Sequence, residues 1–202
     1  AAMTYEEAMA VYGCDKPDLR FGVQIKDLSD IAAQTELSVF KSVVAAGGKV
    51  KGICVPGCGN YSRSQLEDLT QLARSFGAGG LVTIALGTTP GNLDGLTMEM
   101  VKSAVAKYLT LDQVMNMARR FNGNMGDLLL IVAGKPRLVA TVLGELRKEM
   151  VHRLTLADPN VLSFGWLVDF PLLEIDEKTW GVQPVRHPFT MPVEEDIPLL
   201  DT

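Results

Sequence analysis

The chain has 202 residues, of which 47% are hydrophobic and 21% are charged, as expected for a soluble globular protein of one or two domains. Its longest apolar runs, such as Leu128–Ala133, are too short to span a bilayer, and no basic segment followed by an apolar run opens the chain. Three cysteines, an odd number, fit a reducing compartment better than a disulfide framework, so we expect a cytoplasmic protein without a membrane segment.

Charge is distributed unevenly along the chain. The net charge of −5 argues against strong nonspecific binding to nucleic acid, so no DNA partner is expected. Residues 24–155 carry 15 Lys and Arg against 11 Asp and Glu, whereas the two flanks together carry 4 basic and 13 acidic residues. The middle therefore differs in character from the ends, and its basic surplus is compatible with a position near RNA.

The first predicted element is a short helix, Thr4–Tyr12. Thr4 and Glu7 have the spacing of a capping box, and Gly13 supplies the stop. The residues that follow, Cys14–Arg20, are mostly polar, have no period and contain a proline, so they are predicted to form a loop. Loops often carry functional groups, which makes this one a candidate site.

Two strands are predicted next, Leu37–Ala45 and Val50–Val55. Both are rich in strand-forming residues, and Gly47-Gly48 between them is a hairpin signal. Overlapping capping boxes then open a helix over Ser62–Phe76. The apolar run Leu81–Leu86 is predicted to form a third strand.

The rest of the middle region continues this alternation. Helical spacing of apolar residues predicts two small helices, over 98–108 and 111–121, whose methionines fill the core. Leu128–Ala133 is an apolar strand, and Pro136 begins a long helix that reaches His152. Four strands and two main helices predict a two-layer α+β domain from about Gln24 to Thr155, with an antiparallel four-stranded sheet and helices on one face.

A second β unit is predicted near the C-terminus. Trp166–Ile175 and Trp180–Val185 flank a charged turn and have the pattern of a hairpin. Directly after it, Arg186-His187-Pro188-Phe189-Thr190 places a cation, an imidazole and a hydroxyl on a stiff segment at a strand end. Ligands are often held at such places, so this segment is a second candidate site.

Two patterns near the second strand have simple structural explanations. The glycine-rich turn Gly57–Ser62 lies between a strand and a helix, but it lacks the third glycine and the acidic partner of a dinucleotide site. Cys54 and Cys58 are four residues apart, yet a structural zinc site needs four ligands. The other candidates, Cys14, His152 and His187, are not at ligand spacing, so no metal is expected.

The remaining polar groups of the middle region are predicted to be surface residues. His152 lies near the end of the long helix, where a cation suits the helix dipole. Arg119-Arg120 and Lys135 with Arg137 could meet a phosphate backbone, but a solvated face is the simpler interpretation.

Together, these segments resemble the bacterial-type aspartyl-tRNA synthetases, a class II family. Met3–Met9 with Tyr12–Arg20 is similar to the family's stretch after class II motif 2. Asp169–Leu172 with His187–Thr190 is similar to its stretch before motif 3. The middle resembles the family's inserted GAD domain, through Val50–Gly57, Ser103–Leu109 and Leu143–Arg147. The family usually has Ser where Cys14 stands and a second His where Arg186 stands.

The resemblance implies a division into three parts. Residues 1–23 would be a catalytic-domain segment that follows motif 2, and residues 156–202 a catalytic-domain segment that precedes motif 3. Residues 24–155 would be the inserted GAD domain with a DCoH-like fold, flanked by pieces of the class II catalytic sheet. The chain would then be an internal fragment, because motif 1, the ATP-binding arginines and the anticodon-binding domain lie outside it.

For the intact protein, the resemblance implies an aspartate–tRNA ligase. Such an enzyme activates L-aspartate with ATP and Mg²⁺, transfers it to tRNA(Asp), and is a homodimer through segments absent here. Its pocket needs cations for two carboxylates and an anion for the ammonium group. Which residues touch the substrate and which brace a neighbour stays open; no catalytic residue, bound cofactor or activity is expected of the fragment alone. The candidate substrate-binding residues are Asp15, Lys16, Asp18, Arg20, Arg186 and His187.

Two alternatives come from other classes of protein. GAD domains also occur in subunits of tRNA-dependent amidotransferases, where such a module would contact tRNA without performing chemistry. A subunit of that kind has no reason to carry both Asp15–Arg20 and His187–Thr190, so the flanks favour the ligase. A generic α+β interaction domain is the third alternative.

Overall fold

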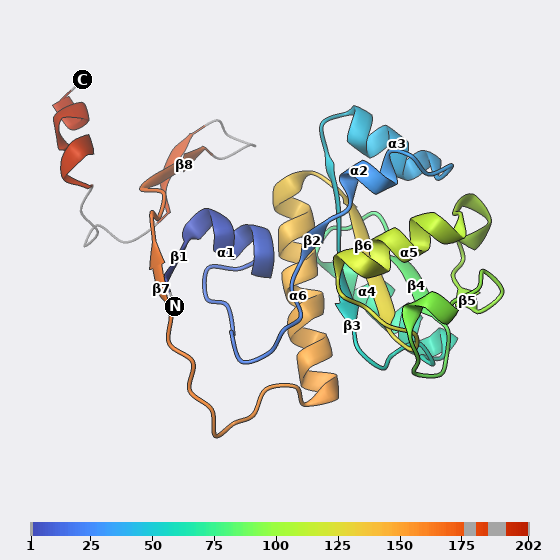
Figure 1. Cartoon of the computed structure of the whole chain (residues 1–202). Coiled ribbons are helices and arrows are strands. Elements are labelled where there is room, and N and C mark those ends of the chain that lie inside the picture. Colours follow the sequence, from blue (N-terminus) through green and yellow to red (C-terminus); the bar gives the residue numbers. More distant parts are fainter. Residues whose placement is uncertain (1, 176–180, 186–192, 202) are drawn as a thin grey trace.

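The computed structural model describes residues 2–175, 181–185 and 193–201 (Figure 1). Its centre is an antiparallel five-stranded sheet with the strand order β2-β3-β6-β4-β5. The two longest strands, β3 and β6, pair over seven residues, from Lys49 opposite Gly134 to Val55 opposite Leu128. The strands are β2 (Lys26–Asp27), β3 (Lys49–Val55), β4 (Val82–Leu86), β5 (Val101–Lys102) and β6 (Leu128–Gly134).

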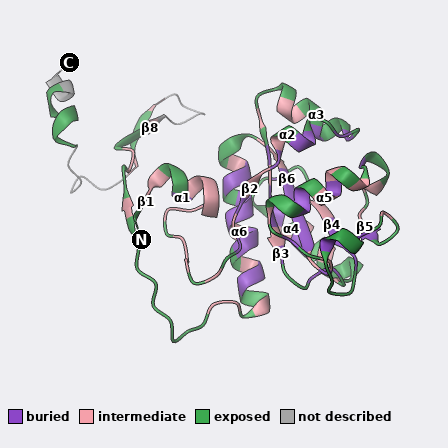
Figure 2. Ribbon diagram, in the orientation of Figure 1, coloured by how far each residue is buried: buried purple, intermediate pink, exposed green. Residues whose placement is uncertain are grey.

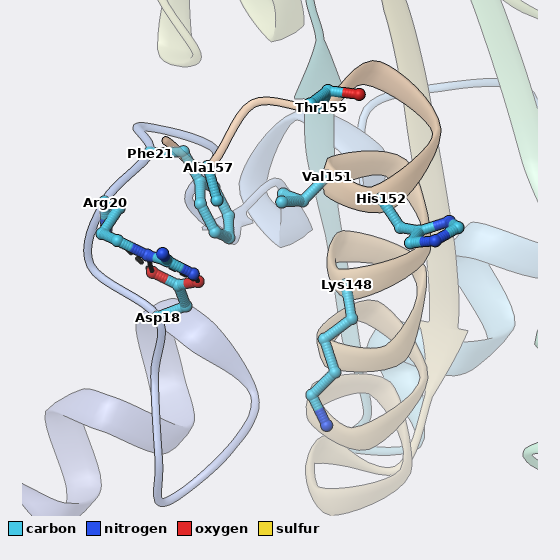
Figure 3. A pocket seen from close by; sticks show the side chains of 8 residues that line it. All are labelled: Asp18, Arg20, Phe21, Lys148, Val151, His152, Thr155 and Ala157. Atoms are coloured by element: carbon cyan, nitrogen blue, oxygen red, sulfur yellow. Dashed lines mark hydrogen bonds and ion pairs between the residues drawn. The ribbon is translucent and has the colours of Figure 1, made fainter. Parts of the chain in front are cut away.

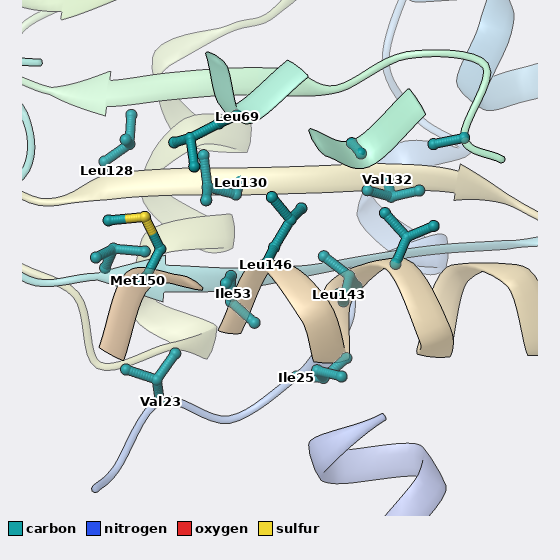
Figure 4. Packing of buried hydrophobic residues seen from close by; sticks show 14 of the residues in the cluster. Val23, Ile25, Ile53, Leu69, Leu128, Leu130, Val132, Leu143, Leu146 and Met150 are labelled. Atoms are coloured by element: carbon teal, nitrogen blue, oxygen red, sulfur yellow. The ribbon is translucent and has the colours of Figure 1, made fainter. Parts of the chain in front are cut away.

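Helices cover both faces of this sheet. Alternate residues of β6 enter different core clusters: Leu128, Leu130 and Val132 face one side, and Leu129 and Ile131 face the other. Helices α4 (Arg63–Ser75) and α6 (Pro136–Leu154) pack on the first side, as Figure 4 shows for α6. Helices α2 (Ser29–Ala32), α3 (Ser38–Ala45) and α5 (Leu111–Arg120) pack on the second side.

The prediction of a two-layer domain with helices on one face is therefore wrong, although its antiparallel sheet is confirmed. A strand with one solvated face alternates apolar and polar residues, whereas β6 is apolar at every position from Leu128 to Ala133. That continuous run already requires an apolar layer on each side. The sheet also has five strands rather than the predicted four.

The segment Leu37–Ala45 was predicted as a strand and forms helix α3 instead. Its β-branched residues favour a strand locally, but Leu37, Phe40 and Val44 recur at helical spacing and pack into the second core cluster. Gly47, with φ of +77°, lies directly after the end of this helix rather than in a hairpin turn.

A second error concerns residues 98–108, where helical spacing predicted a small helix. The structure has the edge strand β5 and a 3-10 turn, Ala106–Tyr108, in this stretch. The other predicted elements of the middle region are confirmed within two residues of their ends. In particular, the Ser62–Gln65 capping box opens α4, and Pro136 is the first residue of α6.

The two flanks of the chain meet in a second, smaller sheet. Strand β1 (Ala2–Thr4) pairs in parallel with β7 (Trp166–Val168), so residues about 160 positions apart lie side by side (Figure 1). The predicted hairpin is shorter than expected: β8 (Leu173–Ile175) pairs with β9 (Val182–Pro184), while β7 belongs to the other sheet. The predicted turn, residues 176–178, and the first residue of the predicted second strand lie outside the described residues.

Apolar side chains of the C-terminal flank are unusually exposed (Figure 2). Leu162, Phe164 and Trp166 expose 79%, 82% and 76% of their surface. Exposed apolar stretches of this kind are typical of surfaces that pack against another segment or another protein. Within the described residues, no helix has the length and apolarity needed to cross a membrane.

Candidate functional site

The candidate loop Cys14–Arg20 begins where helix α1 (Tyr5–Tyr12) docks on α6. The capping box of Thr4 and Glu7 opens α1 as predicted, and Gly13 ends it with φ of +71°. Gly13 lies backbone to backbone against Gly144 of α6: a Cβ atom on Gly13 would be 2.2 Å from the carbonyl oxygen of Ala140. Glycine at both positions therefore permits the close approach that fixes the start of the loop.

Within the loop, Asp18 and Arg20 bind each other. Arg20 Nη2 is 2.7 Å from Asp18 Oδ2, Arg20 Nε is 2.9 Å from Oδ1, and the Arg20 backbone N–H also donates to Oδ1 at 3.0 Å. Hydrogen bonds from Arg20 lower the pKa of Asp18, and the same contact raises the pKa of Arg20. Arg20 Nη1 reaches the carbonyl oxygen of Asp158, 3.1 Å away, in the segment that follows α6.

Arg147 of α6, in the middle region, contacts this loop from the other side. Its side chain is 1% exposed, and its Nε and Nη2 donate to the carbonyl oxygens of Val23 and Asp18, each at 2.6 Å. The guanidinium group lies over the rings of Phe21, 4.0 Å from the centroid, and Tyr12, 4.8 Å away. Burial lowers the pKa of Arg147. The hydrogen bonds and ring contacts offset part of the desolvation cost of burying the guanidinium group.

A cavity of about 460 Å³ lies between the loop and the end of α6 (Figure 3). Figure 3 shows Asp18 and Arg20 opposite the helix, with Val151 pointing toward Phe21 and Ala157. Lys148 and His152 line the helical side of the same cavity. Because Arg20 is paired with Asp18, and Lys148 with Glu145 at 2.6 Å, the cavity carries little unpaired charge.

The structure therefore joins two of the predicted site residues and adds others that sequence reasoning missed. Asp15 is half-buried and Lys16 is exposed. Arg186 and His187 lie outside the described residues. His152 is exposed as predicted, but it also lines the cavity. Arg147 could have been noticed, because it follows Leu143 by four positions and so lies on the apolar side of the helix.

The cysteines of the middle region lie in a second cavity of about 450 Å³ or close to it. Cys54 Sγ is 3.8 Å from Asp127 Oδ2, and burial is the main cause that raises the pKa of both Cys54 and Cys58. Burial and a contact with Cys58 raise the pKa of Tyr61 to about 12. Zinc binds thiolates, so protonated thiols are poor ligands. Among the described residues, no three His, Cys, Asp or Glu gather as a metal site.

The arginines proposed to lie on a solvated face do so, and they are paired. Arg119 Nη2 is 3.6 Å from Asp94 Oδ1, and Arg120 binds the carboxylate of Asp30. Arg137 at the start of α6 forms an ion pair of 2.7 Å with Glu174 of β8. This last contact also connects the middle region to the C-terminal flank.

Comparison with known proteins gives two findings. A family profile described as the GAD domain matches residues 40–143, half of the chain. The chain is also 52% identical over 99% of its length to an aspartate–tRNA(Asp/Asn) ligase of Dehalococcoides mccartyi (strain CBDB1). The ligase of the same name from Moorella thermoacetica is 47% identical over 99% of the chain. That of Caldanaerobacter subterraneus subsp. tengcongensis is 45% identical over 98% of the chain. The chain spans about a third of the length of these relatives: 33%, 32% and 32%.

Proposed function

The chain belongs to the GAD-domain family, and we propose that it is a segment of an aspartate–tRNA ligase that carries this domain as an insert. The extent of the similarity carries the proposal. The three relatives align along 98–99% of the chain, which includes both flanks, whereas the GAD profile alone matches only residues 40–143. A tRNA-binding module of an amidotransferase would share the insert but not these flanks.

We propose the domain limits 1–23, 24–155 and 156–202 for the catalytic segment, the insert and the second catalytic segment. Pairing of β1 with β7 supports this division, because an inserted domain must leave and rejoin its host at neighbouring points. The exposed apolar side chains around Trp166 also fit a flank that packs against the rest of a longer protein.

The aspartate pocket is proposed to lie between the Cys14–Arg20 loop and the His187–Thr190 segment. His187 would face a substrate carboxylate, and Arg186 would lie beside it. Asp18 and Arg20 are engaged with each other and with the chain around them, which favours a bracing role. Asp15 and Lys16 carry the charges that suit the ammonium and carboxylate groups of aspartate, and both are proposed for direct contact with it.

In the intact protein, aspartate would attack the α-phosphate of ATP, and the terminal ribose of tRNA would then capture the adenylate. The described residues hold no carboxylate cluster that fits Mg²⁺, so no step of this chemistry is assigned to them. ATP, Mg²⁺ and the dimer contacts would belong to other parts of the protein. The compartment proposed is the cytoplasm, where tRNA charging occurs.

Aspartate-dependent pyrophosphate exchange by the intact protein tests this function. We expect exchange with aspartate and ATP, and charging of tRNA(Asp) transcripts with labelled aspartate. Because the relatives are named for both tRNAs, tRNA(Asn) transcripts belong in the same assay. The 202-residue chain alone should show no exchange, since catalysis depends on positioned ATP. An intact protein that binds tRNA but exchanges no pyrophosphate would favour the binding-module alternative.

A further inference from the structure

The largest fully buried side chain of the described residues is a charged one, Arg147. It lies in α6 of the insert, yet its two described hydrogen bonds go to the backbone of residues 18 and 23 in the flanking segment. We infer that Arg147 is a positioning residue, through which the inserted domain sets the conformation of the candidate substrate loop. The role in substrate binding rests on the proposed function, whereas the role in loop geometry does not.

The geometry requires a guanidinium group. Nε and Nη2 lie on one edge of a rigid plane, and they reach two carbonyl oxygens that are five residues apart in the chain, those of Asp18 and Val23. The faces of the same plane meet the rings of Phe21 and Tyr12. A lysine ammonium has no such plane and bears its donors at one point, so it cannot hold both carbonyls and both rings in this arrangement.

The hydrogen bond from Arg147 to Asp18 is the first of a series of contacts that connects the insert to both flanks. Arg147 holds the Asp18 backbone, the Asp18 carboxylate holds Arg20, and Arg20 holds the carbonyl oxygen of Asp158 beyond α6. A short distance after Val23, the Ile25 N–H donates to the carbonyl oxygen of Val11 in α1 at 2.8 Å. One side chain thus stabilises the loop, the end of α1 and the segment that returns to the second flank.

Removal of the Arg147 side chain should destabilise the loop more than it destabilises the central sheet. The core clusters on the two faces of the sheet are built from apolar side chains and do not include Arg147. Without the guanidinium, the carbonyl oxygens of Asp18 and Val23 lose a buried donor, which is costly at the loop itself. The insert can therefore keep its fold while residues 18–23 become free to open.

Hydrogen exchange in the intact protein measures this opening directly. In Arg147→Met, amides of residues 18–23 should exchange at least about tenfold faster, because two charge-assisted hydrogen bonds are lost. Amides of β3 and β6 should keep their wild-type rates. Arg147→Lys retains the charge and should show the same pattern more weakly, and it carries the test if Arg147→Met does not fold. Arg153→Met is the matched control, since Arg153 lies on the same helix and pairs with Glu149 at 2.6 Å.

Kinetics of the intact enzyme separate positioning from a loss of folded protein. With rates normalised by active-site titration, the KM for aspartate should rise about tenfold in Arg147→Met, while the KM for ATP stays within about twofold. Arg147→Lys should recover part of the aspartate KM, and Arg153→Met should match the wild type. A purely structural defect would lower the titrated active fraction and leave both KM values unchanged.

Unchanged exchange of residues 18–23 in both variants would overturn the inference. Faster exchange with an unchanged KM for aspartate would overturn the part that concerns substrate binding. A wild-type protein that does not activate aspartate at all would instead refute the proposed function. In that case, the exchange experiment would still decide whether Arg147 positions the loop.

Discussion

Substitution of Gly13 by alanine probes the contact on which the candidate loop is built. Gly13 has φ of +71°, a conformation that costs an L-residue roughly 1–2 kcal/mol. The new Cβ would also lie 2.2 Å from the carbonyl oxygen of Ala140 and 2.8 Å from Cα of Gly144. These are backbone atoms of α6 and cannot move aside like a side chain. Overpacking of this kind costs typically about 1–3 kcal/mol, so we expect a total destabilisation of about 2–5 kcal/mol.

Gly47→Ala is the matched control for this substitution. Gly47 also follows a helix of eight residues and has φ of +77°, but no heavy atom lies within 4 Å of its added Cβ. Its cost should therefore be the conformational one alone, roughly 1–2 kcal/mol. The excess of Gly13→Ala over Gly47→Ala isolates the close approach of α1 to α6.

Urea unfolding followed by circular dichroism gives the free energy of unfolding for each variant. A thermal scan should agree, since each kcal/mol corresponds to roughly 2–4 °C in Tm for a chain of this size. Hydrogen exchange should localise the added loss in Gly13→Ala to α1 and residues 14–23. Equal destabilisation in the two variants would refute the reasoning, because the α1–α6 contact would then add nothing to the stability of the chain.

Three further outcomes are expected. In the intact protein, His187→Ala should cut aspartate activation by about 100-fold or more if the proposed contact to a substrate carboxylate is correct, because that contact is then lost. Arg119→Ala should leave pyrophosphate exchange unchanged. Elemental analysis should find no stoichiometric zinc. The Cys54 and Cys58 thiols should be alkylated more slowly at pH 8 than a small free thiol, at rates that increase with pH. Fast alkylation at pH 8 would contradict the raised pKa values. Because the folded-state pKa of Asp18 lies below the ordinary value of 3.8 for an aspartate, the stabilisation that its ion pair provides is present above that pH and is lost as pH falls through the folded-state pKa. Asp18→Asn should therefore weaken the pH dependence of the unfolding free energy below about pH 4. At pH 7 it should cost less than about 1 kcal/mol, because the ion pair is partly exposed. An unchanged pH dependence below about pH 4 would contradict a stabilising Asp18–Arg20 ion pair.

Local sequence rules succeeded where the signal is contained in one segment. Capping boxes such as Ser62–Gln65, the proline at the start of α6 and the glycine after α1 each satisfy backbone groups at a helix end, so they can be interpreted without the rest of the chain. The long apolar run of β6 is equally local. The resemblance of the flanks to a synthetase was also contained in the sequence, since it depends on the order of short motifs.

Tertiary structure decided the remaining features, because each depends on residues distant in sequence. Leu37–Ala45 has strand-forming residues, but burial of Phe40 against the second face of the sheet makes it a helix. Strands β2 and β5 have two residues each and exist only through their partners. Arg147 is an ordinary helical arginine until the fold brings the carbonyl oxygens of Asp18 and Val23 to it, and a contact across more than 120 positions has no local pattern.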